Sequence, residues 1–248
     1  MKKIKYLILF LCMFFILTSC GVTYRKDNIT HDLERLVEKD TGEKSKACVV
    51  GKTLYLDMKV DEITLPVESE AFLNAFNKIR TAVFDVSRVV LSSDSEVEFM
   101  VVTAYNSMYT VIIRFIENIN DIKSYIHTQI SKSDYESRGL FEVFGESVNE
   151  IITDKHDISN EEFIGRLVVL NLNAIKPYGW IFKYKSVRGK TLFLISLEKY
   201  DEETVSLVKK FLIEHLKCYL KKYNNPFEFV DIFTLNGKEV MSFPLGTE

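Results

Sequence analysis

Gly51-Lys52-Thr53-Leu54-Tyr55-Leu56 (GKTLYL) is the most informative segment of the sequence for the fold. Its first three residues match the end of a Walker A loop, which binds nucleotide phosphates. That loop needs a glycine five positions upstream and a helix directly downstream. Lys46 stands at the upstream position, and Leu54–Val60 reads as a strand. We therefore predict a turn between two strands and no nucleotide site.

A near-identical stretch, GKTLFL, begins at Gly189, 138 residues further along the chain. Tyr184 stands five positions before this second glycine, so the Walker A glycine is again missing. A strand-like segment lies on each side of both glycines, and glycine readily adopts the positive φ of a tight hairpin. Two such copies predict an internal repeat.

The segments around the two copies also match. Helical spacing of apolar residues follows each copy, a second strand pair follows each helix, and a shorter helix precedes each copy. The expected helices are 32–37, 70–90, 159–174 and 201–220, and the expected second strand pairs are 97–103 with 109–115 and 227–234 with 238–243. The expected fold class is α+β, with two similar helix-hairpin-helix-hairpin units. Each would be an antiparallel sheet with helices packed on one face.

The amino terminus has the pattern of an export signal. Lysines at positions 2, 3 and 5 precede the apolar run Tyr6–Leu17. These twelve residues are too few for a helix to span a hydrocarbon core of about 30 Å. They fit the apolar region of a cleaved secretory signal.

Leu17-Thr18-Ser19-Cys20 follows this run. Basic start, apolar run and this tetrapeptide together resemble the signal and lipobox of bacterial lipoproteins. The resemblance implies cleavage between Ser19 and Cys20, diacylglycerol on the Cys20 thiol, and a fatty acid such as palmitate on the new amino terminus. It also implies export to the cell envelope, with a lipid anchor in the cell membrane or outer membrane and a periplasmic or surface-facing body.

Five segments follow from these patterns. We expect a cleaved signal peptide (1–19), a lipidated tether (20–30), a first α+β unit (31–116), a helical connector (117–157) and a second unit (158–248). Cleavage removes three lysines and no acid, which takes the formal charge from −3 to −6. A mildly acidic chain has no basic footprint for nucleic acid. The expected membrane contact is therefore the lipid on Cys20.

No residue pattern predicts chemistry. The four histidines, at positions 31, 127, 156 and 215, are scattered and lack metal-ligand spacing. There is no nucleophile elbow, so we expect no enzyme, no metal and no cofactor. Cys48 and Cys218 carry no spacing signal, and whether they pair stays open.

An aromatic stripe is the remaining feature. Tyr178, Trp180, Phe182 and Tyr184 alternate along one strand and so share a face. Packing under the helices is the favoured interpretation; the alternative is a binding surface, with Tyr105 at a hairpin tip as a second candidate. The preferred function is a non-enzymatic binding or structural module, with an envelope protein as a possible partner. The alternative is a carrier of a lipid or small apolar ligand, and nothing in the sequence supports a third hypothesis, a hydrolase with a dispersed site.

Overall fold

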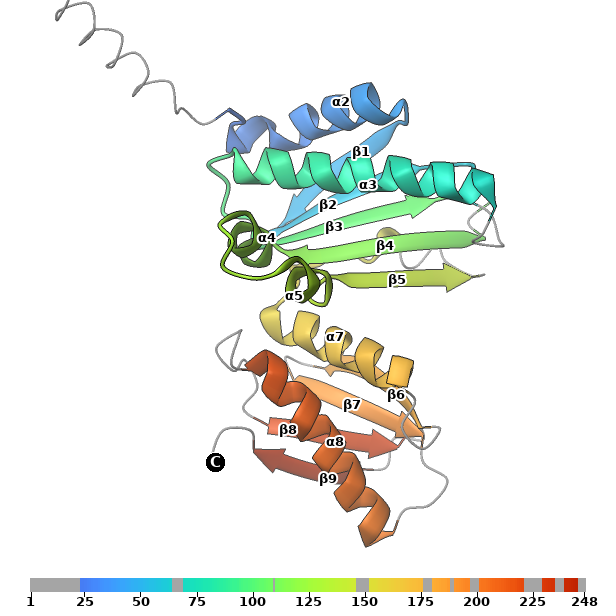
Figure 1. The fold of residues 1–248 in the computed structure, drawn as a ribbon, viewed down its shortest axis with the longest axis vertical. Helices are drawn as coiled ribbons and strands as arrows, with labels where there is room; N and C mark the ends of the chain where they lie inside the picture. The colour runs from blue at the N-terminus through green and yellow to red at the C-terminus, as the bar shows by residue number, and fades with distance from the viewer. Residues whose placement is uncertain are drawn as a thin grey trace, which may run out of the picture. The chain divides into compact units, whose positions relative to one another are not determined.

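The computed structural model describes residues 23–63, 69–108, 110–145, 152–175, 180–187, 190–196, 201–220, 229–234 and 239–244 (Figure 1). Contacts divide the chain into two units. Unit 1 runs to Ser131 and includes Phe141–Lys155; unit 2 consists of Lys132–Leu140 and the chain from His156 onward. The described part is a mixed α/β fold with six α-helices and a five-stranded sheet.

The turn predicted at Gly51 joins the antiparallel strands β1 (Ser45–Val50) and β2 (Thr53–Lys59). Gly51 has a φ of 58°, a left-handed conformation that a Cβ atom would disfavour. The predicted strand after Gly51 is therefore confirmed. No helix follows the motif, so it cannot complete a Walker A loop.

The other elements of this sheet and its helices follow in chain order. They are η1 (Lys26–Asn28), α2 (Ile29–Thr41), α3 (Glu70–Leu91), β3 (Phe99–Tyr105), β4 (Val111–Asn118), α4 (Ile119–Ile126) and β5 (Leu140–Gly145). The strand order is β1-β2-β3-β4-β5. Ser69 caps the start of helix α3: its hydroxyl accepts a hydrogen bond from the Phe72 amide at 3.1 Å.

The sheet is mixed, so the prediction of an antiparallel sheet is wrong. Strands β2 and β3 pair in parallel, from Thr53 with Phe99 to Lys59 with Tyr105. Helix α3 causes this pairing because it carries the chain back along the sheet before β3 begins. The hairpins β1–β2 and β3–β4 are antiparallel.

Helices α2 and α3 cover one face of the sheet, here called the helix face (Figure 1). The Ser87 hydroxyl of α3 lies 3.5 Å from the Met100 sulfur, which places Met100 and its cross-strand partner Leu54 on that face. Alternate strand residues point to the opposite, rear face. The rear face is also buried, and its buried residues include Tyr55, Asp57, Val101, Thr103, Arg114 and Ile116.

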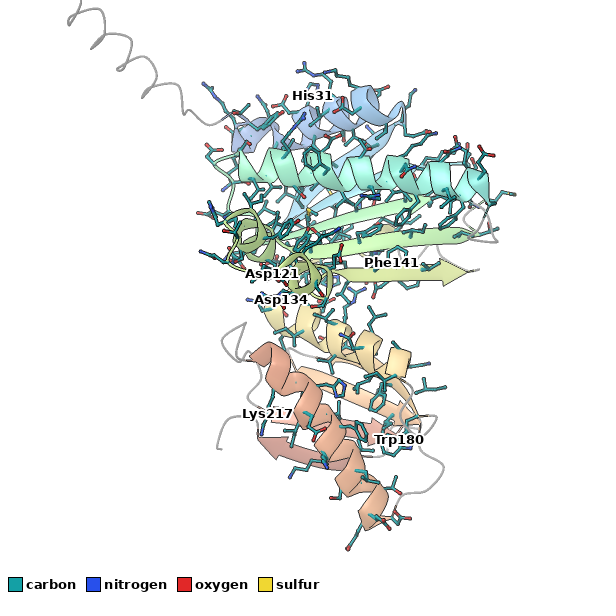
Figure 2. The ribbon with its side chains drawn as sticks, in the orientation of Figure 1. His31, Asp121, Asp134, Phe141, Trp180 and Lys217 are labelled. Carbon is teal, nitrogen blue, oxygen red and sulfur yellow. The ribbon has the colours of Figure 1, made fainter. Side chains whose placement is uncertain are left out.

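Strand β5 corrects the predicted domain boundaries. Residues 117–157 were expected to form a helical connector, but β5 lies within them and extends the sheet beside β4. Its Phe141 ring packs 4.9 Å from Phe115 of β4 and 6.2 Å from Phe76 of α3, measured between ring centroids (Figure 2). These aromatic contacts explain why the segment joins unit 1 as a strand.

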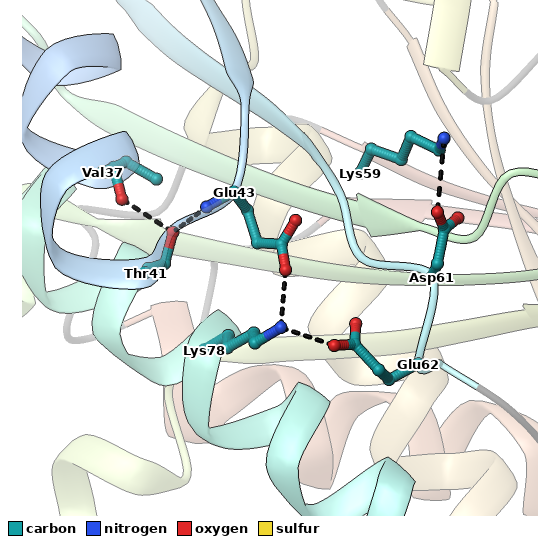
Figure 3. A network of polar contacts seen from close by, with 7 residues as sticks. All are labelled: Val37, Thr41, Glu43, Lys59, Asp61, Glu62 and Lys78. Carbon is teal, nitrogen blue, oxygen red and sulfur yellow. Dashed lines mark hydrogen bonds and ion pairs between the residues drawn. The ribbon is translucent and has the colours of Figure 1, made fainter.

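A surface network of ion pairs links α3 to the segments that follow α2 and β2 (Figure 3). The Lys78 ammonium of α3 lies 2.5 Å from the Glu43 carboxylate and 2.6 Å from the Glu62 carboxylate. Glu43 first and Glu62 second raise the pKa of Lys78. All three side chains are part-exposed, so solvent screens the pairs, and the network ties loops together more than it stabilises the core.

Unit 2 has its own helices and sheet. Its elements are α5 (Lys132–Glu136), α7 (Asn160–Ile175), β6 (Ile181–Val187), β7 (Lys190–Ser196), α8 (Glu202–Leu220), β8 (Phe229–Thr234) and β9 (Glu239–Pro244). The strand order is β6-β7-β8-β9, and β7 and β8 are parallel while the other pairs are antiparallel. The predicted antiparallel sheet is wrong here too. Gly189 lies outside the described residues, but the remainder of GKTLFL forms β7.

Candidate functional site

The predicted lipid-attachment site, Ser19 and Cys20, lies outside the described residues. What the structure does describe is the chain that follows it. The amides of Thr23 and Tyr24 donate to the Ser92 carbonyl at 3.0 and 3.2 Å, and Tyr24 pairs with Ser93 in a short parallel bridge. The predicted tether 20–30 is therefore wrong from Thr23 onward, because the chain is already bonded to the loop after α3.

The next residues strengthen this attachment. The Lys26 amide donates to the Asp94 carboxylate at 2.6 Å, and η1 leads directly into α2. Ile29, Leu33 and Val37 of α2 are buried, so α2 belongs to the core of unit 1. In the sequence, two residues, Gly21 and Val22, separate Cys20 from Thr23.

The aromatic stripe of unit 2 lies in the core. Trp180 is 7% exposed and Phe182 1%, and the Trp180 ring packs 6.2 Å from Phe211 of α8 (Figure 2). Asn173 of α7 bonds both the amide and the carbonyl of Phe182 at 2.8 Å. The binding-surface alternative is therefore wrong for Trp180 and Phe182, and core packing is confirmed.

The remaining candidates give a mixed result. Tyr184 is half-buried, and its ring lies where a side chain at Gly165 of α7 would be, so it packs under that helix. Tyr178 lies outside the described residues. Tyr105 is half-buried within β3, so the prediction that it sits at the hairpin tip is wrong, whereas Met108 in the turn is highly exposed.

A polar row crosses the rear face of unit 1, which the sequence did not single out. Asp57 of β2 is paired in register with Thr103 of β3, and Thr103 with Arg114 of β4. The Lys155 ammonium lies 2.5 Å from the Asp57 carboxylate and 5.9 Å from the centre of the Tyr55 ring. These contacts with β2 therefore attach Lys155, the last residue of unit 1, to the rear face of the sheet.

Burial disfavours the ionised form of the Asp57 carboxyl in this row. Desolvation raises the pKa of the Asp57 carboxyl above its usual range, while Lys155, Arg114 and Thr103 act in the opposite direction. A carboxylate with these partners is satisfied in place, so the row fits a structural role. Its signal in the sequence was weak: a single acid inside an apolar strand and a lysine in a polar run.

A second buried acid lies in the helix layer. Asp85 of α3 is buried, and one of its carboxyl oxygens, Oδ2, makes no hydrogen bond. Burial and then the nearby charge of Asp40 raise the Asp85 pKa to about 6. Ionisation of Asp85 therefore costs stability at neutral pH, because burial and the charge of Asp40 outweigh the opposing effect of Arg88 and Lys39.

No described part of the chain groups three or more histidine, cysteine or acidic side chains as a metal site. His31, for example, lies on the outer side of α2 (Figure 2). Cys48 is a free thiol, and the side chain of Cys218 lies outside the described residues. Among the helices that are described, none combines the length and apolar character needed to cross a membrane.

We compared the chain with family models, curated proteins and solved structures. None of the three comparisons finds a match.

Proposed function

We propose that this protein is a lipid-anchored lipoprotein of the bacterial cell envelope that acts as a non-enzymatic binding or structural module. The observation that carries the proposal is the hydrogen bonding of Thr23, the first residue that the structure describes. Thr23 is bonded to the loop after α3 only three positions after Cys20, the residue that the lipobox pattern marks for acylation. Three residues span at most about 10 Å, so the anchor would hold unit 1 directly against the membrane.

The interior of both units supports a non-enzymatic role. Asp57, the buried acid of the rear face, is bonded to Lys155. The aromatic side chains Trp180 and Phe182 of unit 2 are in the core. The groups that most resembled a reactive or ligand-binding site therefore stabilise the interior of the unit to which each belongs.

The two units are, in this proposal, copies of one pattern. Each has a helix, an antiparallel strand pair, a second helix and another antiparallel pair, joined in the middle by a parallel pairing. The near-identical hexapeptides at Gly51 and Gly189 support this relation. Edge strands of such sheets can add a strand from a partner protein, and an envelope protein is the proposed partner.

The anchor is tested by metabolic labelling with an alkyne-tagged fatty acid. The protein should take up the label and fractionate with membranes, and Cys20→Ser should abolish labelling. Cys48→Ser is the matched control, because Cys48 lies within unit 1 and should not affect labelling. Equal labelling of the Cys20→Ser protein would refute the anchor.

The module role is tested on the labelled protein. Crosslinking in intact cells followed by purification should recover one protein partner in constant ratio. Native mass spectrometry of the purified protein tests the carrier alternative, in which a lipid or small apolar ligand would be retained. A retained ligand without a protein partner would replace the proposed function by the carrier.

A further inference from the structure

The chain enters unit 1 at the end of the sheet where α4 begins. Tyr24 pairs with Ser93, in the loop that leads from α3 to β3. The Glu98 carbonyl at the end of that loop accepts a hydrogen bond from Ile119, the first residue of α4, at 2.8 Å. Figure 1 shows η1 and α4 at the same end of unit 1.

The side chains of α4 divide into two sets. Ile119, Asp121 and Ile122 are buried, so the first turn of the helix is fixed to unit 1. The last turn of the helix is exposed, and it is apolar and basic: Tyr125 is 37% exposed and Ile126 57%, and Lys123 is also exposed. The acid of this helix, Asp121, is among its buried residues, so α4 exposes no carboxylate.

This composition fits a lipid surface. Tyrosine is enriched at membrane–water interfaces, and lysine is attracted to anionic headgroups. Transfer of an apolar side chain such as Ile126 from water to the boundary of the acyl chains lowers the free energy of the system. A short helix with these residues would not bind a membrane by itself, but it would orient a protein that is already anchored beside it.

We propose that the exposed last turn of α4, from Lys123 to Ile126, rests on the membrane that holds the lipid of Cys20. The inference rests on the proposed lipid anchor, which holds Thr23, at this same end of unit 1, within about 10 Å of Cys20. The lipid supplies the affinity, and α4 fixes which end of unit 1 faces the membrane.

The opposite end of α3 supplies a matched control. Leu73 is 55% exposed, close to the value of Ile126, and lies near the start of α3. About 27 Å of helix separates Leu73 from Leu91, next to the loop that holds Thr23. A probe at Leu73 should therefore remain in water while a probe at Ile126 meets lipid.

The test uses the full lipidated chain in vesicles of phosphatidylethanolamine and phosphatidylglycerol with brominated acyl chains, which quench nearby tryptophan. Trp180 is the single tryptophan of the sequence, and the unmodified protein gives its baseline. In the Ile126→Trp protein the added tryptophan should lose about half of its emission, since interfacial residues sit about 5–10 Å into the membrane. The Leu73→Trp protein should lose none beyond the baseline.

Tyr125→Trp is a second probe in case one substitution disturbs α4. Mass spectrometry of each sample first establishes whether Cys20 carries lipid. Lipidated protein in which neither α4 probe is quenched, or in which Leu73→Trp is quenched equally, overturns this inference and leaves the anchor intact. Protein without lipid on Cys20 overturns the anchor and this inference together.

Discussion

Asp85 shows how one residue sets the pH dependence of unit 1. Burial and the charge of Asp40 raise its pKa to about 6, from 3.8 in an unfolded chain. The proton is therefore held more tightly in the folded protein. The stabilisation from this group is complete below pH 3.8 and is lost as the pH rises through 6. At pH 7 the ionised carboxylate costs up to about 3 kcal/mol.

Asp85→Asn should remove that cost, because the amide stays neutral and can donate to Asp40. We expect the free energy of unfolding at pH 7 to rise by about 1–3 kcal/mol. The gain should disappear near pH 4. Urea unfolding at pH 7 and pH 4 measures the difference in unfolding free energy from the unmodified protein. Asp27→Asn on exposed η1 is the control and should show no such gain at pH 7. A gain of equal size at both pH values would show that ionisation is not the cause.

Asp57 and Lys155 form the second residue-scale case, because a half-buried ammonium lies 2.5 Å from a buried carboxylate. Lys155→Met would leave the Asp57 carboxylate buried without its main cation. The expected loss in the free energy of unfolding is roughly 3 kcal/mol at pH 7. The loss should shrink at low pH, because burial already raises the pKa of Asp57 and protonation removes the charge.

The double variant Asp57→Asn/Lys155→Met separates the pair from simple packing loss. With both charges gone, most of the lost stability should return, as double-mutant cycles show for coupled neighbours. Urea unfolding of the four proteins at pH 7 gives the coupling free energy. Additive effects of the two substitutions would contradict a coupled ion pair.

At the scale of elements, local patterns predicted the hairpin at Gly51 and the extent of α3. A glycine between apolar strands and a capping serine at Ser69 each act over a few residues. The parallel pairing of β2 with β3 could not be predicted, because it depends on the path of α3 rather than on residues of either strand. The same reason hid β5, whose place is set by contacts of Phe141 with distant residues.

The sequence did not predict the polar row of the rear face or the bonding of Thr23 and Tyr24, for a related reason. Asp57 and Lys155, which are far apart in the sequence, meet only after the sheet has formed and Lys155 lies against its rear face. Thr23 and Tyr24 bond to a loop that follows α3. The aromatic stripe of unit 2 was predictable as core because its period of two matched a strand beneath helices.

At the scale of the whole molecule, the two units have separate sheets and cores. Trp180 is the single tryptophan, so its fluorescence reports unit 2 alone. Gly165→Ala would place a Cβ 2.4 Å from the Tyr184 ring. We expect a net loss of about 1–2 kcal/mol in the urea transition followed by Trp180, since overpacking outweighs the gain in helix propensity. Asp85→Asn should leave that transition unchanged.

The sign of the Gly165 effect should depend on Tyr184. In a Tyr184→Ala background the ring is gone, so Gly165→Ala should add up to about 1 kcal/mol of stability through helix propensity. A loss of equal size in both backgrounds would mean that the Tyr184 ring is not what occupies the space beside Gly165. A shift of the Trp180 transition by Asp85→Asn would mean that the units unfold together, because a change confined to unit 1 can reach Trp180 only through coupled unfolding.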